Sequence, residues 1–321
     1  MSRICDITYY FHSGFSVAID DTFLLFDYWL GEEGDLPQEV RLTESRLAKY
    51  KNVIIFVSHC HPDHYDEAIY DFRALPNVTY IISADAPVGS RGKRMARGDK
   101  LTIGNVNITA YGSTDPGVSY LAEIDGMRFF HAGDLNFWHW RKESTLKEIE
   151  KAEADFGECL KELDGVKMDV AFFPVDPRMG EMYDAGATTF IYQIKPRLLF
   201  PMHWQRRAEV AVDFARRQTN RNTEIVALTK AGQNCRCDFT ETEISLRISS
   251  FKRREEEDEA EKAAILFEHD EMITEEERKP SRIAEAVAKA KEKASRQPSD
   301  EASTEFDPDD PFHNTDLPVK L

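Results

Sequence analysis

The sequence predicts a layered α/β sandwich over its first 250 residues. Short runs rich in aromatic and β-branched residues indicate strands, and they alternate with amphipathic stretches that indicate helices. The opening runs are joined by turns as short as "HSG" and "DD", which favours antiparallel hairpins. Because helices bury their apolar stripe against a sheet face, the pattern indicates sheets covered by helices. We expect two sheets of similar size.

The expected elements follow one another along this part of the chain. The strand-like runs cover residues 7–11, 15–19, 22–27, 53–58, 78–83, 106–112, 118–124, 127–133, 168–175, 197–203 and 243–249. A helix is expected over 144–163, because its apolar residues recur at spacings of three and four. Thr145 and Glu148 supply a capping box at its start. Further helices are expected over 185–194 and 206–218.

Composition changes near residue 250, where an acidic segment begins. Residues 251–321 contain 12 Lys and Arg against 21 Asp and Glu, which is more than half of the formal net charge of −17. Residues 281–296 could form one charged helix with Ser281 as its cap, and the last residues are expected to be disordered. We therefore expect an α/β domain at 1–250 and an acidic, partly helical and partly disordered tail at 251–321.

Charge, hydropathy and cysteine content narrow the class of protein. The net charge of −17 disfavours broad contact with nucleic acid, which is itself a polyanion. The start of the chain lacks the pattern of a secretory signal, and no apolar run has the length of a membrane span. The five irregularly spaced cysteines are expected to be free thiols, and Cys235-x-Cys237 is only a weak metal motif. We expect a cytoplasmic protein with no membrane partner.

The segment that follows the expected strand at 53–58 carries the strongest functional signal. It places three histidines and one aspartate close together, namely His59, His61, Asp63 and His64. Side chains two positions apart on extended backbone face the same side, so the first two imidazoles should point together. Pro62 ends the strand, and the turn after it should bring Asp63 and His64 back toward the strand end. Imidazoles and a carboxylate suit Zn²⁺, Fe or Mn, so the sequence predicts a metal site.

This H-x-H-x-D-H motif after an apolar strand resembles the signature of the metallo-β-lactamase superfamily of dinuclear metallohydrolases. The opening hairpins, in which Asp27 closes a strand, are similar to the family's N-terminal segment. "RFFHAGDLN" resembles its Gly-Asp segment, and "LLFPMHW" resembles its late strand that ends in a histidine. The resemblance covers roughly residues 4–248 and implies a four-layer αβ/βα sandwich with two central mixed sheets. Among the branches, the chain is most similar to lactonase-like and uncharacterised zinc-dependent hydrolases.

The resemblance also implies ligands for two divalent metal ions, with Zn²⁺ expected first and Mn²⁺ or Fe²⁺ as alternatives. It assigns one ion to His59, His61 and Asp115 and the other to Asp63, His64 and His203, with Asp134 bridging both. Where the family normally has a third histidine for the first metal, this chain has Asp115 in "STDPG". Asp115 is either a ligand or a residue that only shapes its turn, and His139 could complete the first site instead.

Further residues near these segments are candidates for supporting roles. His12 and His131 are expected to orient a ligand or a substrate rather than to bind metal. The expected catalytic residues are Asp63, His139 and His12. The arginines at 178, 206 and 207 could contact an anionic substrate group, although an exposed helical turn is the plainer explanation for the last two. All four tryptophans flank the site segments and could wall an apolar pocket or stack on a ring, namely Trp29, Trp138, Trp140 and Trp204.

Together these expectations describe a small-molecule hydrolase. Two metals that share one water lower its pKa, deliver hydroxide to an electrophile and stabilise the charge that develops on the attacked oxygen. The expected substrate is an ester, lactone or phosphoester of a small molecule, anionic or carrying a ring, and a homo-oligomer is an open alternative to a monomer. Two other functions compete with this one. A phosphodiesterase or nuclease is disfavoured by the acidic balance, and a catalytically degenerate metal-binding scaffold would use the acidic tail to dock a partner.

Overall fold

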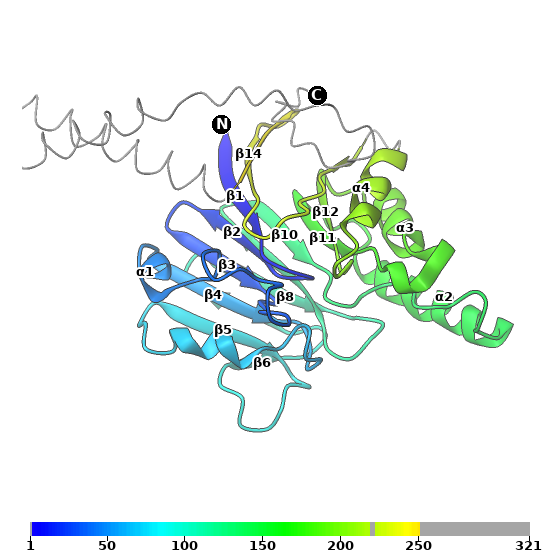
Figure 1. The fold of residues 1–321 in the computed structure, drawn as a ribbon, viewed down its shortest axis with the longest axis horizontal. Helices are drawn as coiled ribbons and strands as arrows, with labels where there is room; N and C mark the ends of the chain where they lie inside the picture. The colour runs from blue at the N-terminus through cyan, green and yellow to red at the C-terminus, as the bar shows by residue number, and fades with distance from the viewer. Residues whose placement is uncertain (1, 219–221, 251–321) are drawn as a thin grey trace, which may run out of the picture. The chain divides into compact units, whose positions relative to one another are not determined.

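The computed structural model describes residues 2–218 and 222–250, and it contains two mixed β-sheets with helices (Figure 1). The sequence-based prediction of a layered α/β sandwich with two central mixed sheets is therefore confirmed. The acidic tail expected at 251–321 lies outside the described residues, so the boundary near residue 250 stays a prediction. Among the described helices, none combines the length and the apolar character needed to cross a membrane.

The first sheet has eight strands in the order β15-β14-β1-β2-β3-β4-β5-β6. They are β1 (Arg3–Tyr9), β2 (Phe15–Ile19), β3 (Thr22–Phe26), β4 (Asn52–Val57), β5 (Val78–Ser83), β6 (Lys93–Met95), β14 (Asn234–Phe239) and β15 (Ile244–Ser249). β1, β2 and β3 form the predicted antiparallel hairpins, whereas β3, β4 and β5 run parallel. The carboxyl ends of β3 and β4 therefore meet at one edge of this sheet.

The second sheet has seven strands in the order β13-β12-β11-β10-β9-β8-β7. They are β7 (Lys100–Ile103), β8 (Val106–Tyr111), β9 (Ser119–Ile124), β10 (Met127–His131), β11 (Val170–Pro174), β12 (Leu198–Met202) and β13 (Glu224–Ile225). Strands β7 to β10 pair antiparallel, and β10, β11 and β12 pair parallel. Each sheet thus has a parallel half whose strand ends can present loops at a common edge.

Within residues 2–218 and 222–250, the three helices predicted for this part of the chain are present, together with a short one that was not predicted. The α-helices are α1 (Glu44–Leu47), α2 (Leu146–Glu162), α3 (Ala185–Ile194) and α4 (Ala208–Arg217), with 3₁₀ turns at Glu67–Phe72 and Pro177–Met182. The predicted capping box at the start of α2 forms, with Thr145 and Glu148 bonding each other's backbone. Helices α2, α3 and α4 gather beside β11 and β12 (Figure 1), where they bury their apolar stripes.

The core lies between the two sheets. The ring of Phe15 on β2 is 4.7 Å from that of Phe172 on β11, and the ring of Phe56 on β4 is 5.2 Å from that of Tyr120 on β9. All four side chains are almost fully buried. Burying one such aromatic side chain stabilises the fold by about 1.5–3 kcal/mol relative to exposing it, so these contacts fix how the sheets face each other.

At the edge where β4 ends, a glycine allows a loop of the second sheet to approach the first sheet closely. Gly117, in the loop between β8 and β9, has a φ of +91°, and a Cβ placed there would lie 2.2 Å from the carbonyl oxygen of Ser58 and 2.4 Å from Cβ of His59. The next residue, Val118, donates its N–H to the same Ser58 carbonyl at 3.0 Å. The β8–β9 loop therefore approaches the end of β4 as closely as backbone allows, and only glycine fits.

Replacing Gly117 by Ala should therefore cost more than the same change at Gly98. Gly98 also has a positive φ, +89°, but no atom lies within 4 Å of its missing Cβ. Both variants lose about 1–2 kcal/mol to the left-handed backbone, so the difference between them isolates the steric clash. We expect Gly117→Ala to lower the free energy of unfolding by about 1–3 kcal/mol more than Gly98→Ala in denaturant titrations. Equal losses would show that the loop is free to move away from β4.

Candidate metal centre

The H-x-H-x-D-H segment is separated from the end of β4 by Ser58 alone, so it follows a strand as the sequence predicts. His59 is fully buried, whereas the side chain of His61 is 41% exposed. Its Nδ1 lies 3.0 Å from Nε2 of His59, so the two imidazoles do face the same side. The backbone N–H of His64 bonds the carbonyl of His61 at 3.0 Å, which closes one turn and brings Asp63 and His64 back toward the strand end.

Asp134 lies at the middle of the cluster, in the loop after β10. Its Oδ1 is 3.1 Å from Nε2 of His64 and 3.2 Å from Nε2 of His203, while its Oδ2 is 3.5 Å from Nε2 of His59. Burial opposes ionisation of Asp134, but His203 and His64 outweigh it and hold the pKa of this carboxyl well below its usual range. One ionised carboxylate thus faces imidazoles from two other parts of the chain, with each oxygen turned to a different side.

The structure also brings Asp115 to the cluster, in the β8–β9 loop. Its Oδ2 lies 3.7 Å from Nδ1 of His61, and its side chain is 34% exposed. Burial and the nearby Asp134 carboxylate raise the pKa of Asp115, because a second negative charge is unfavourable there. Two carboxylates that crowd each other beside an imidazole are what a bound cation would relieve.

His139, the alternative to Asp115, is not brought into the cluster. It is 4% exposed, its Nδ1 contacts the carbonyl of Phe137 at 3.4 Å, and its ring packs on the Phe137 ring at 4.4 Å. It belongs to none of the metal-compatible groups found among residues 2–218 and 222–250. The geometry therefore favours Asp115 over His139 as the residue that completes the first site, and it gives His139 no contact that supports the expected catalytic role.

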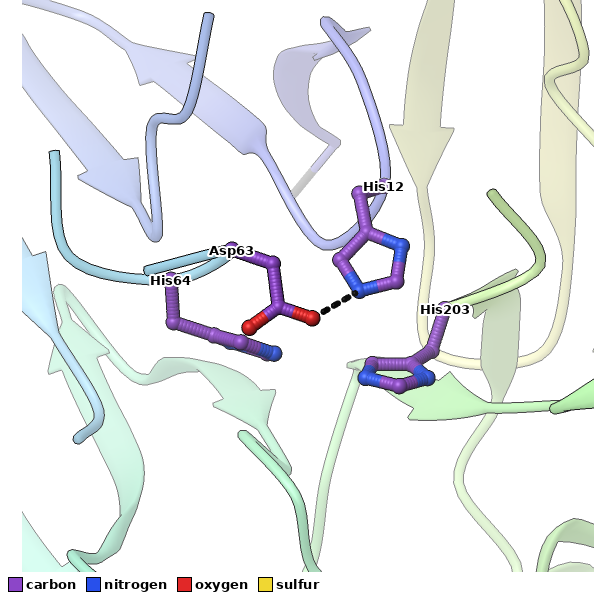
Figure 2. A group of neighbouring side chains, drawn as sticks. All are labelled: His12, Asp63, His64 and His203. Carbon is purple, nitrogen blue, oxygen red and sulfur yellow. Dashed lines mark ion pairs between the residues drawn. The ribbon is translucent and has the colours of Figure 1, made fainter. Parts of the chain in front are cut away.

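His12 lies closer to the ligands than the sequence suggests. Figure 2 shows its imidazole directed at Asp63, with Nε2 3.2 Å from Oδ2 of that carboxylate, and beside His64 and His203. Its ring centroid is 4.0 Å from that of His203. Burial and the neighbouring His203 lower the pKa of His12 to about 3, so the ring is neutral. The expectation that His12 orients a ligand or a substrate stays a prediction.

Three overlapping sets of donor atoms could hold a metal ion. The sets are His12, Asp63, His64 and His203; His59, His64 and Asp134; and His61, Asp115 and Asp134. In these sets Nε2 of His64 and Nε2 of His203 are buried within 3.2 Å of Oδ1 of Asp134, yet none of the three atoms makes a hydrogen bond of regular geometry. Leaving such atoms unsatisfied is costly, and divalent metal ions would satisfy them all. The donors present therefore fit the metal ions that the sequence predicts, and no cysteine takes part in any of the three described sets.

Buried carboxylates hold two of the imidazoles from behind. Asp27, which follows β3, accepts from the N–H and the hydroxyl of Ser58 at 2.7 and 2.6 Å and contacts Nδ1 of His64 at 2.7 Å. Burial disfavours protonation of His64, but Asp134 and Asp27 outweigh it and raise its pKa well above the usual value. This histidine therefore has a carboxylate on each ring nitrogen. A divalent cation bound in front of it would take the place of the Nε2 proton.

Asp176 holds the imidazole of His203 in the way that Asp27 holds that of His64. It follows β11, its Oδ2 lies 3.0 Å from Nδ1 of His203, and Arg178 contacts it through two guanidinium nitrogens. Burial alone would lower the pKa of His203, but the Asp134 and Asp176 carboxylates outweigh this effect and raise the pKa of His203 to about 9. The sequence analysis missed Asp176, although it follows a fully apolar strand just as Asp27 does. That shared pattern is the signal that could have found it.

Of the other candidate residues, some lie beside the histidines of the cluster and others are buried in the core or already paired. Trp29 packs edge-on against His12 at 5.6 Å and Trp138 against His203 at 5.6 Å, whereas Trp204 is 3% exposed and belongs to the core. His131 donates from Nε2–H to the carbonyl of Ser13 and accepts the N–H of Gly133 at Nδ1. The remaining groups expected to meet a substrate are already paired, namely Arg178 with Asp176, Arg206 with Asp35 and Glu32, and Arg207 with Glu209.

A rim of imidazoles and carboxylates at one edge of a two-sheet α/β sandwich defines a metal-binding protein of the metallo-β-lactamase fold. A family model described as "Beta-lactamase superfamily domain" matches residues 24–204. The chain belongs to this superfamily, as its motifs predict. The expectation of an enzyme of this fold, a metal-dependent hydrolase, agrees with the family match.

Relatives of this chain carry names that fit the same class. A metal-dependent hydrolase from Opitutus terrae is 24% identical over 230 residues, which are 64% of this chain and 88% of the relative. A solved structure of Igni18, a metallo hydrolase from the archaeon Ignicoccus hospitalis, is 16% identical and covers 74% of this chain and 99% of its own. Its TM-score of 0.53 supports a shared fold.

Asp176→Asn should weaken metal binding although Asp176 belongs to none of the three sets of donor atoms. The amide cannot hold Nδ1–H of His203 as the carboxylate does, and losses of this kind reduce metal affinity about 10–100-fold. Competition with a chromogenic chelator measures the change. Asp213→Asn is the matched control, because Asp213 bonds Tyr183 and Arg217 at the protein surface. Unchanged affinity in Asp176→Asn would show that His203 is oriented by its backbone alone.

Proposed function

We propose that this chain hydrolyses an ester, lactone or phosphoester bond of a small molecule with two divalent metal ions held side by side. The observation that supports two ions is the Asp134 carboxylate, whose Oδ1 faces His64 and His203 while its Oδ2 faces His59. Zinc is the first candidate. Asp115 in place of an imidazole makes the first site harder and more anionic, which favours Mn²⁺ or Fe²⁺ as alternatives.

The side chains of the centre would hold the two metal ions and fix the orientation of the metal ligands. When bound, the two ions supply Lewis acidity and acidify a water that attacks the substrate. His59, Asp134 and His64 are buried, and they would hold the ions from the inner side of the centre. Asp27 and Asp176 fix the imidazole orientations, so little reorganisation accompanies the reaction. Trp29 and Trp138 border the imidazoles with apolar rings.

A small molecule suits this centre better than a nucleic acid. The arginines that flank the site segments are in ion pairs, and the net charge of the chain is −17. A nuclease needs unpaired cations along a track of phosphates, because neutralising phosphates supplies most of its affinity. This supports the small-molecule assignment over the nuclease alternative.

Asp134→Ala should remove at least one equivalent of bound metal and lower hydrolysis by more than about 100-fold, since a bridging ligand is lost. Metal content is measured by elemental mass spectrometry, and hydrolysis with a panel of lactones, aryl esters and phosphoesters. Asp21→Ala is the control, because Asp21 is exposed and paired with Lys51 at the opposite end of β3. Full metal content in Asp134→Ala, or no metal in the wild-type protein, would overturn the proposal. Salt-sensitive binding of nucleic acid would favour the nuclease instead.

A further inference from the structure

The inference concerns His12, and it rests on the proposed metal centre. His12 lies in the loop between β1 and β2, far in sequence from the H-x-H-x-D-H segment, and its side chain is fully buried. Neither of its ring nitrogens makes a hydrogen bond of regular geometry, although Nε2 lies 3.2 Å from Oδ2 of Asp63. His131 is equally buried, yet both of its ring nitrogens are bonded, to the carbonyl of Ser13 and the N–H of Gly133. Burial alone therefore does not leave a histidine of this protein without partners.

The backbone of His12 is held in a conformation that few residues adopt. Its φ is +54°, in the left-handed region that is uncommon for a residue with a side chain. Its N–H donates to the hydroxyl of Tyr9 at 3.0 Å, and its carbonyl accepts the N–H of His203 at 3.2 Å. Strained residues persist where the surrounding structure fixes them, and they gather at functional sites. Here two hydrogen bonds fix the backbone so that the ring faces Asp63.

The contacts of the ring are those of a ligand rather than of a packing residue. Its Nε2 lies 3.2 Å from Oδ2 of Asp63, and its donor atom falls within 4.8 Å of those of Asp63, His64 and His203 (Figure 2). Trp29 packs edge-on against the same ring, with 5.6 Å between the ring centroids. Nε2 of His12 therefore points into the same space as Asp63, His64 and His203, which the family resemblance assigns to one metal.

We propose that His12 is a further side-chain ligand of the metal position formed by Asp63, His64 and His203, beside the Asp134 carboxylate that the proposed function shares between both ions. Four protein donors already fill a structural zinc site, whereas a catalytic site keeps an open position, so a position that also holds His12 would have no place for a substrate. His12, His64 and His203 are fully buried and Asp63 is 27% exposed, while His61 and Asp115 of the other set are 41% and 34% exposed. The position of His12, Asp63, His64 and His203, which we call the deep position, is thus the more enclosed of the two. The other, the outer position, is where water and substrate enter.

Release of metal to a chelator tests this assignment on the full chain. Wild-type protein loaded with Zn²⁺ should lose metal in a fast and a slow phase of about one equivalent each, the slow phase coming from the deep position. His12→Phe keeps an aromatic ring against Trp29, and His12→Asn tolerates the positive φ, but neither retains the imidazole. Both should speed the slow phase at least about 10-fold and leave the fast phase unchanged. Asp115→Ala should instead speed the fast phase and leave the slow phase unchanged.

His139→Phe is the matched control, because His139 is also buried against an aromatic ring but lies in none of the three described sets. It should leave both phases unchanged. A slow phase that is unaltered in His12→Phe and His12→Asn, with both variants folded by circular dichroism, would overturn the role of His12. It would leave the proposed function intact, since two metals are still bound. Absence of metal from the wild-type protein would instead overturn the proposed function.

A measurement on the wild-type chain covers the case in which both variants fail to fold. With cadmium-113 as the metal and nitrogen-15 in the histidine rings, a scalar coupling is seen only between a metal and a nitrogen bonded to it. We expect such couplings for His12, His64 and His203 and none for His139. Couplings to His64 and His203 without one to His12 would show that His12 only neighbours the metal.

Discussion

The site depends on one buried carboxylate, that of Asp134. It is 5% exposed and lies 3.1–3.5 Å from imidazole nitrogens of His59, His64 and His203. Removing an ion from water costs several kcal/mol unless opposite charge and hydrogen bonds compensate. In this protein the compensation comes from the imidazoles of His64 and His203, whose pKa values the Asp134 carboxylate raises. The same geometry that stabilises the carboxylate therefore prepares a place for divalent cations.

The fold delivers these groups through strand ends. The chain leaves β3 at Asp27, β11 at Val175 and Asp176, and β12 at His203, and the H-x-H-x-D-H loop and Asp134 follow β4 and β10 within a few residues. Asp27 and His203 have positive φ, +41° and +67°. A left-handed residue turns the backbone sharply at the strand end, which aims its side chain inward rather than along the strand. Parallel halves in two facing sheets place all of these turns at one rim.

Local sequence signals predicted the features that depend on neighbours in the chain. The α3 helix at 185–194, the capping box of α2 and the two co-facing histidines of the motif follow from spacing alone. Features that depend on packing across the sheets were not predictable in this way. Strand β14 pairs with β1 from more than two hundred residues away, and Asp176 reaches His203 only because β11 and β12 are neighbours. Trp204 follows His203 in sequence but turns into the core.

The charges of the ligands set a limit on what the proposed dinuclear centre can bind. In the proposed centre Asp63, Asp115 and Asp134 would bring three carboxylates to two dications, where the family pattern has a neutral imidazole in place of Asp115. The centre therefore keeps one positive charge fewer, and electrostatic attraction for a polyanion falls accordingly. Asp115 also lies on the exposed side, next to His61, so this lost charge is felt where a substrate would approach. A neutral lactone or ester, or a singly charged phosphodiester, matches such a centre better than a multiply charged phosphate.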